Sequence, residues 1–165
     1  MSLGVAHNAG LKLAIAGAKP FDHPIKGMRA IAYLCDWAPM QLVMTKDFAT
    51  RHGIRTFEDI AVKTPPLRVA VNRRGNIAAT VAERMFAAIG VTPEDIKRWG
   101  GEVIYAASNE QTTLYKDGRI DLIFNSLFVK QGSLIDATES VASVLLPVSD
   151  ATIAKVDAEM STQKY

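Results

Sequence analysis

A polar turn near the middle of the chain, Asn72-Arg73-Arg74-Gly75-Asn76, has the composition of an anion-binding site. An apolar segment typical of a strand precedes it, and an amphipathic segment typical of a helix follows it. The first backbone N–H groups of a helix have no partners within the helix, and the helix dipole gives that end partial positive charge. Two arginines add positive potential, and the glycine lets the backbone approach a bound group closely. The alternative interpretation is a plain connection between strand and helix, with both arginines solvated.

The segments on either side of the turn must position it. Residues 67–71 form a nearly continuous apolar run, which is typical of a strand covered on both faces. From Ile77 to Ile89, apolar residues recur every four positions, so one broad face of a helix is predicted to be buried. Thr80 falls away from that face, and Gly90 supplies a C-terminal stop. The turn is therefore predicted to join a buried strand to the first turn of an amphipathic helix.

Strands and helices alternate along most of the chain. Strands are predicted at 28–34, 40–44, 67–71, 102–106, 120–124 and 142–146, and helices at 77–89, after Thr92, from Ser108, at 133–140 and at 151–160. This alternation predicts an α/β fold with a mostly parallel sheet and helices on both faces. Ligands in such sheets bind outside the carboxyl ends of the strands. Turn 72–76 and the pair Asn125-Ser126 are both predicted to lie at such ends.

Local capping signals predict where several helices begin. Thr56, with Asp59 three residues later, predicts a capped helix over 57–61, and Ser108 with Gln111 predicts a second start of the same kind. Thr92 is followed by a proline at the first helical position and by acidic residues in the first turn. Residues 3–17, rich in small apolar side chains, predict a helix or the edge of a strand-helix unit.

Composition excludes some classes of protein. The chain has 165 residues, of which 48% are hydrophobic, so it is long enough to bury a real core. Its net charge of +2 is small and evenly spread, and it has no basic run or aromatic platform, so we expect no nucleic-acid partner. No apolar segment is long enough to span a bilayer, so the protein is not expected to be embedded in a membrane. The first residues lack the basic region and apolar stretch of a signal peptide.

Motifs for catalysis, metals and cofactors are missing. His7, His23 and His52 do not stand at metal-binding spacing with another histidine, cysteine or carboxylate, so we expect no metal site. The turn lacks the Gly-Lys-Ser/Thr ending of a P-loop, and there is no dinucleotide-binding Gly-x-Gly-x-x-Gly. No Ser, Cys or Lys lies in a nucleophile motif. We therefore expect no cofactor, no catalytic residues and no enzymatic activity.

Five segments carry a resemblance to a known family through their order and spacing. They are Met28-Arg29-Ala30-Ile31-Ala32, Gln41-Leu42-Val43-Met44, His52-Gly53-Ile54-Arg55-Thr56-Phe57-Glu58-Asp59-Ile60, Leu67-Arg68-Val69-Ala70-Val71 with its glycine turn, and Tyr115-Lys116-Asp117-Gly118-Arg119-Ile120-Asp121-Leu122-Ile123-Phe124. Together they resemble the solute receptors of tripartite ATP-independent periplasmic (TRAP) transporters, specifically the TAXI family. The resemblance covers about residues 4–155.

The resemblance implies a type II periplasmic-binding-protein fold, in which two α/β lobes joined by crossover strands close over a small solute. Such receptors bind amino acids, carboxylates or similar solutes in the periplasm, pass them to a TRAP-type membrane permease, and are not enzymes. A complete receptor is roughly twice as long, so we expect the second lobe with parts of the first, and no signal peptide in this chain. The implied division is 1–38 for a remnant of the first lobe and crossover, 39–128 for the second lobe, and 129–165 for a return crossover and C-terminal helices.

The resemblance and the turn together predict a solute site. We expect an anionic group of the solute to bind the first N–H groups of the helix, from Asn76 to Ala78, with charge supplied by Arg73 or Arg74. Gly75-Asn76 corresponds to a Gly-Ser turn of the family, Asn8 would belong to the other lobe, and Trp37 to the crossover. The candidate ligand-binding residues are Asn8, Trp37, Arg73, Arg74, Gly75, Asn76, Ile77, Thr80, Asn125 and Ser126.

Two other functions remain open from the sequence. The same fold serves as the effector-sensing domain of bacterial transcription regulators, which would be favoured by a helix-turn-helix upstream in the gene. An enzyme on a parallel α/β sheet is the third possibility, and the missing nucleophile, metal and cofactor motifs count against it.

Overall fold

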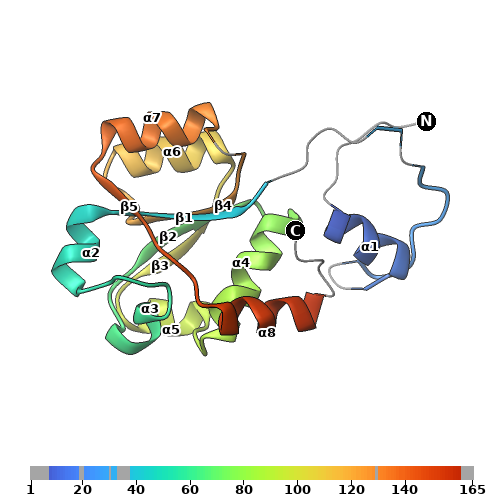
Figure 1. Cartoon of the computed structure of the whole chain (residues 1–165), viewed down its shortest axis with the longest axis horizontal. Coiled ribbons are helices and arrows are strands. Elements are labelled where there is room, and N and C mark those ends of the chain that lie inside the picture. The colour runs from blue at the N-terminus through green and yellow to red at the C-terminus, as the bar shows by residue number, and fades with distance from the viewer. Residues whose placement is uncertain (1–7, 19–20, 30, 33–37, 129, 161–165) are drawn as a thin grey trace.

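The computed structural model describes residues 8–18, 21–29, 31–32, 38–128 and 130–160, and Figure 1 shows a sheet between two layers of helices. Its elements, in chain order, are α1 (Asn8–Ala16), β1 (Met40–Thr45), α2 (Lys46–His52), α3 (Asp59–Lys63), β2 (Arg68–Val71), α4 (Ile77–Ala88), α5 (Pro93–Arg98), β3 (Glu102–Tyr105), α6 (Ser108–Lys116), β4 (Leu122–Ser126), α7 (Gly132–Ser140), β5 (Ser143–Leu145) and α8 (Asp150–Met160).

The five strands form one sheet in the order β3-β2-β4-β1-β5. Strand β2 pairs in parallel with β3 and β4, whereas β1 pairs antiparallel with β4 and β5. It follows that β1 runs against the other four strands. The predicted α/β class with a mostly parallel sheet is confirmed.

Helices bury the sheet on both faces. Alternate residues of each strand point to opposite sides and so enter two separate apolar clusters. Val69 and Phe124 lie in the larger apolar cluster, which side chains of α3, α4, α5 and α8 cover. Ala70 and Ile123 lie in the second cluster, against α6 and α7. Figure 1 shows α6 and α7 on one side of the sheet and α3, α5 and α8 on the other. The prediction of helices on both faces is also confirmed.

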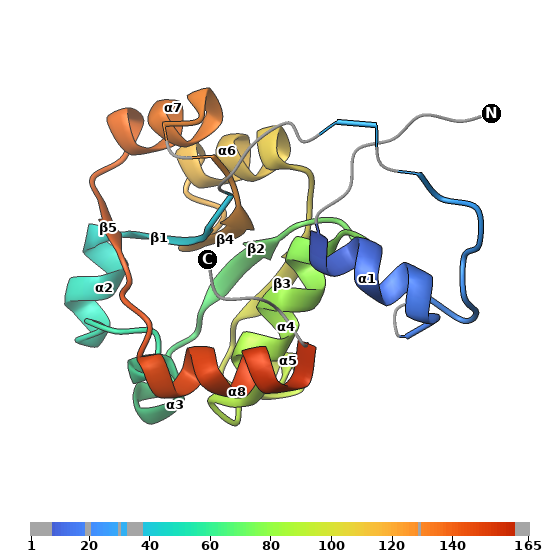
Figure 2. The same cartoon turned by 45° about the vertical axis from the view of Figure 1, so that its right-hand side comes forward.

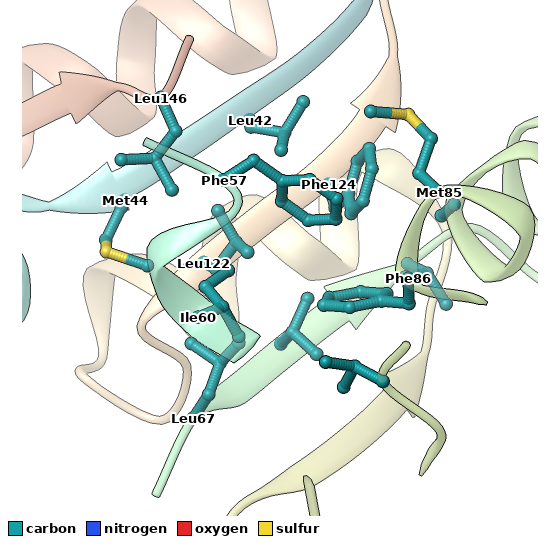
Figure 3. Close-up of a cluster of buried hydrophobic side chains, with 14 of the residues drawn as sticks. Leu42, Met44, Phe57, Ile60, Leu67, Met85, Phe86, Leu122, Phe124 and Leu146 are labelled. Atoms are coloured by element: carbon teal, nitrogen blue, oxygen red, sulfur yellow. The ribbon is translucent and has the colours of Figure 1, made fainter. Parts of the chain in front are cut away.

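Three phenylalanines form the centre of the larger cluster (Figure 3). The ring centroids of Phe57 and Phe86 lie 5.2 Å apart, and Phe124 lies 5.5 and 5.6 Å from them. These separations are in the favourable range for tilted and edge-on aromatic pairs. Phe57 comes from the segment before α3, Phe86 from α4 and Phe124 from β4, so the aromatic group ties both sequence halves to the sheet.

Some sequence predictions need correction. No strand covers the described residues of the segment 28–34, namely 28–29 and 31–32; residues 30 and 33–34 lie outside the described part. Helix α2, which was not predicted, begins after Thr45, whose side chain accepts from the Phe48 N–H, and ends at Gly53, which has φ of 64°. A short polar helix of this kind carries too little apolar periodicity to stand out in the sequence.

Two predicted helix starts differ in detail. Helix α3 begins at Asp59 rather than at 57, although the Asp59 carboxylate accepts hydrogen bonds from the N–H groups of Thr56 and Arg55, at 2.9 and 2.7 Å. In α6 the cap is Ala107, and Gln111 turns into the interior instead of completing a capping box with Ser108. The box at Thr92 and Asp95 is confirmed. At 108, tertiary partners of Gln111 therefore outweighed the local capping signal.

The C-terminal part of the chain is integrated into this sheet. Strand β5 pairs with β1, α7 packs against α6, and α8 packs against α4. One continuous sheet includes strands from both sides of residue 128. The division of the chain into lobes at residues 38 and 128 stays a prediction.

An ion pair between a buried carboxylate and a partly exposed guanidinium joins the starts of β2 and β4. The Asp121 carboxylate, with 5% of its side chain exposed, accepts from the Arg68 guanidinium at 2.7 and 2.9 Å and from the Arg68 N–H at 3.0 Å. The hydrogen bonds donated to Asp121 raise the pKa of the Arg68 guanidinium. Arg68 also donates to the Gly118 carbonyl at 2.8 Å. The segment 117–121 thus fastens two neighbouring strands at the edge of the sheet opposite their carboxyl ends.

Glu58 links the start of α3 to the start of α8, and this contact predicts a pH-dependent stability. Burial opposes ionisation of the carboxyl, but hydrogen bonds from Thr152 and Ser149 outweigh it and lower the pKa of Glu58 to about 2, from 4.5. Because the native pKa is depressed, this stability is fully present above the unfolded pKa and is lost as the pH falls from about 4.5 toward 2. Since water screens this half-buried group, Glu58→Gln should lower the free energy of unfolding at pH 7 by about 1–2 kcal/mol.

Urea unfolding of wild type and Glu58→Gln between pH 7 and pH 2.5 checks this expectation. The difference between the two proteins should shrink steadily below pH 4.5. The exposed Glu139 on α7 offers the matched control, and Glu139→Gln should change stability by less than about 0.5 kcal/mol. A difference at Glu58 that is constant across the pH range would contradict the role of its hydrogen bonds.

Candidate functional site

The order of the strands places a candidate site between β2 and β4. From β2 the chain runs through α4 to β3, which lies at one edge of the sheet. From β4 it runs through α7 toward β5, which lies at the opposite edge. Where such connections diverge, open α/β sheets bind ligands outside the carboxyl ends of the strands. We call the residues at this place, 71–77, 105–108 and 125–128, the carboxyl edge. It contains the polar turn 72–76 and Asn125-Ser126, as predicted.

Three helices begin at the carboxyl edge or directly beyond it, because each follows a parallel strand. Helix α4 follows β2, α6 follows β3, and α7 follows β4. The first turns of α4 and α7 contain no acidic residue, whereas α6 has Glu110. By contrast, the first turns of α2, α3, α5 and α8 all carry acids. Two of the three helix starts near the edge, those of α4 and α7, therefore carry no acidic side chain that would compete with an anionic ligand.

The turn before α4 uses part of its own hydrogen-bonding capacity. Asn76 is the N-cap of α4, and its Oδ1 accepts from the Ala78 N–H at 2.9 Å. The Asn76 N–H donates to the Arg73 carbonyl at 3.0 Å. Of the three N–H groups expected to bind the anion, only that of Ile77 is without a partner among the described residues. Gly75 has φ of 85°, a backbone conformation that favours glycine.

The two adjacent arginines have different environments. The Arg74 guanidinium lies over the Tyr105 ring, 4.1 Å from its centroid, and the Tyr105 hydroxyl donates to Glu83 of α4 at 2.7 Å. Burial, together with Glu83, raises the pKa of the Tyr105 phenol. The exposed Arg73 guanidinium forms no ion pair or hydrogen bond with any residue that the structure describes. Arg73 is therefore the better placed of the two to meet a solute.

Asn125 and Ser126 already have protein partners. Asn125 is completely buried; its Oδ1 accepts from Asn72, and its Nδ2 donates to Ser108 at 3.0 Å and to Gln111 at 3.1 Å. The Ser126 hydroxyl donates to the Ala38 carbonyl at 2.7 Å. The structure brings Asn125 next to the turn, but with its whole amide engaged. Asn72 and Gln111, which the site prediction did not include, are the residues that engage it.

The remaining described residues of the site prediction lie on α1 and α4. Ile77 packs at the edge of the larger apolar cluster, and Thr80 is half-buried. Figure 2 shows α1 beside the first turns of α4, and a Cβ on Gly10 would lie 3.7 Å from the Ile77 Cβ. Asn8 is the first residue of α1, and nothing is described of its side chain; Trp37 lies outside the described residues.

A small hollow lies next to Arg74 and Tyr105, between α4, α5 and the edge strand β3. It has a volume of about 20 Å³ and is lined by Val71, Glu83, Phe86, Pro93, Ile96, Val103 and Tyr105. A hollow of this size holds roughly one water molecule, so it is too small for an organic solute. It also lies on one face of the sheet rather than between β2 and β4. The candidate site therefore rests on the carboxyl edge and not on this hollow.

The fold and a family match together define the class of this protein. A mostly parallel five-stranded sheet with helices on both faces has the architecture of a periplasmic-binding-protein-like domain. The model of the NMT1-like family matches residues 1–165, and the chain belongs to that family, whose members are periplasmic solute-binding-like proteins. A search among curated proteins found no match. In the described part of the chain, no helix has the length and apolar character needed to cross a membrane.

Proposed function

We propose that this protein is a periplasmic receptor domain that captures a small anionic or zwitterionic organic solute, an amino acid or a carboxylate, for a TRAP-type membrane permease. In this role it binds and releases the solute without chemical change, so it is not an enzyme. The NMT1-like family supports solute binding in general. The assignment to TRAP transport comes from the resemblance of the five segments to TAXI receptors.

One observation carries the choice of an anionic solute. Helices α4, α6 and α7 all begin at or directly beyond the carboxyl edge, and Arg73 extends from the same edge without an acidic partner among the described residues. Partial positive charge from a helix terminus and the full charge of a guanidinium favour the same ligand group. The edge holds no described acidic side chain between residues 71 and 77 that would compete for it.

The described contacts suggest how the solute is held. The Ile77 N–H and the Arg73 guanidinium have no partner among the described residues, and they would bind one carboxylate of the solute. Asn76 would act by holding the first turn of α4 in shape, since its side chain already caps the helix. Arg74 would contribute charge from its position over Tyr105 without moving.

Arg73→Gln tests this arrangement. A charge-assisted hydrogen bond contributes on the order of 1.5–3 kcal/mol, so the substitution should weaken binding of the best solute roughly 10- to 100-fold. A thermal-shift screen of amino acids and carboxylates first identifies a solute, because a ligand of the native state raises the Tm. Isothermal titration calorimetry then compares the affinities of wild type and variant.

Arg119 provides a control of equal charge. It is exposed and precedes β4, at the opposite end of that strand, so Arg119→Gln should leave the affinity unchanged within about twofold. Equal weakening by both substitutions would mean that only overall charge matters. A screen in which no amino acid or carboxylate raises the Tm of the wild-type protein would overturn the proposed function.

A further inference from the structure

Three side-chain amides at the carboxyl edge form one continuous chain of hydrogen bonds. Gln111 Nε2 donates to the Ala106 carbonyl at 2.8 Å, and Gln111 Oε1 accepts from Asn125 Nδ2 at 3.1 Å. Asn125 Oδ1 accepts from Asn72 Nδ2 at 3.0 Å, and Asn72 Oδ1 accepts from the Arg73 N–H at 2.8 Å. Gln111 and Asn125 are 1% and 0% exposed, so water cannot replace these partners. We call this chain the amide relay.

The polarity of the amide relay is fixed at both ends by the backbone. The Ala106 carbonyl can only accept, so the atom of Gln111 facing it must be the nitrogen, and the oxygen must face Asn125. The same reasoning then fixes the orientation of the Asn125 amide and, after it, that of the Asn72 amide. At the far end, the Arg73 N–H can only donate, and it meets the oxygen of Asn72. No single amide can be reversed without leaving a buried pair of two acceptors or two donors, which is costly.

This fixed polarity decides what the carboxyl edge can offer a ligand. Asn125 donates to the Ser108 Oγ at 3.0 Å, so the Ser108 hydroxyl proton points to another acceptor. Asn72 uses one amide proton on Asn125, and its second has no partner among the described residues. The amide oxygens of all three residues, however, are engaged within the relay. The half-buried Asn72 and Ser108 therefore each keep one donor proton for a ligand.

We propose that Gln111 and Asn125 are positioning residues that make the carboxyl edge selective for hydrogen-bond acceptors, by fixing Asn72 and Ser108 as donors and holding the turn at Arg73. Through this relay a buried backbone carbonyl on one side of the sheet sets the preference of the edge for a carboxylate. The selectivity part of the inference rests on the proposed function. The relay itself is a property of the unliganded protein and is testable without a solute.

In Asn72→Asp, the pKa of the new carboxyl should be raised if the relay exists and lowered if it does not. The protonated carboxyl can donate to Asn125 Oδ1 and accept from the Arg73 N–H, so it reproduces the polarity of the amide. The ionised carboxyl faces Asn125 Oδ1 with a second acceptor. The relay therefore raises the pKa of the new carboxyl by about one unit or more above the usual value near 3.9. Without it, two arginines and the start of α4 would lower that pKa below 3.9.

A second substitution separates the relay from simple burial. In Asn72→Asp combined with Gln111→Leu, Asn125 is free to rotate and present its nitrogen to the carboxylate. The pKa should then fall to or below 3.9. Burial of the carboxyl would raise the pKa equally in both variants. Asn76→Asp is the matched control on the same turn, because its oxygen caps the Ala78 N–H in either charge state, and its pKa should be lowered.

Titration of the new carboxyl carbon by NMR measures each pKa. In the wild-type protein, hydrogen exchange of the side-chain amides gives a second measurement that needs no variant: both Asn125 protons and one Asn72 proton should exchange slowly. A pKa at or below 3.9 in Asn72→Asp, a pKa that stays raised in the double variant, or fast exchange of both Asn72 protons would each overturn the relay.

Glutarate and 1,5-diaminopentane, which share a five-carbon chain, test selectivity by thermal shift on wild-type protein. We expect glutarate alone to raise the Tm. If the pKa results hold and glutarate does not bind, the selectivity inference is refuted while the relay stands, and the screen of amino acids and carboxylates decides the anionic-solute proposal separately. If glutarate binds and the pKa results fail, the relay is refuted and the proposed function stands. Stabilisation by the diamine would refute the donor character of the edge.

Discussion

Arg68→Ala should lower the free energy of unfolding by about 3–5 kcal/mol, because it leaves a buried carboxylate without its cation. Asp121 has 5% of its side chain exposed, and two of its three hydrogen bonds come from the Arg68 guanidinium. The remaining bond, from the Arg68 N–H, cannot balance the charge. Since the pair joins the starts of β2 and β4, its loss also loosens the strands whose carboxyl ends form the candidate site.

Urea unfolding at pH 7 measures this effect, and two further variants identify its cause. Arg119→Ala removes the same charge from an exposed position in the neighbouring segment and should cost less than about 0.5 kcal/mol. Replacing both members of the pair, by Arg68→Leu with Asp121→Leu, should cost less than Arg68→Leu alone, because no unpaired charge is then buried. A double variant as unstable as the sum of its parts would show that the ion pair itself is not the cause.

Phe124→Ala should be the most destabilising substitution in the core, with a loss of about 3–5 kcal/mol. Phe124 is completely buried, and Figure 3 shows its ring grouped with those of Phe57 and Phe86. Removing its ring leaves a cavity and ends two aromatic contacts, at 5.5 and 5.6 Å. The surrounding cluster includes residues of the sheet and of the helices on that face, so it cannot collapse into the space freely.

Phe128 is the matched control for this prediction, since it follows the same strand but is 48% exposed. Phe128→Ala should change the free energy of unfolding by less than about 1 kcal/mol. Thermal or urea unfolding of both variants distinguishes the two positions. Similar losses at 124 and 128 would mean that the aromatic group is not the centre of the core.

The candidate site shows where sequence patterns reach their limit. Asn125 is predicted as a ligand-binding residue because it is polar and stands at the end of a buried strand. The structure places it 0% exposed, with every polar atom bonded to Asn72, Ser108 or Gln111. The signal that could have pointed to this role is Gln111, a polar side chain on the apolar face of α6. Local spacing alone favours a capping role for this residue.

The different environments of Arg73 and Arg74 also depend on tertiary structure. Adjacent in sequence, Arg73 and Arg74 were predicted as equivalent sources of charge. Only the pairing of β2 with β3 brings Tyr105 under Arg74 and leaves Arg73 exposed. No local pattern encodes that difference, because Tyr105 lies more than thirty residues further along the chain.

The amino-acid sequence by itself determined the alternation of strands and helices, the α/β class, the start of α4 at the polar turn and the capping box at Thr92, because hydrophobic periodicity and capping act between residues a few positions apart. Tertiary structure alone decided the strand order, the reversed direction of β1 and the partners of Asn72, whose amide meets Asn125 across 53 positions of sequence. Those contacts depend on which strands become neighbours, and burial of the whole sheet between two layers of helices selects that arrangement.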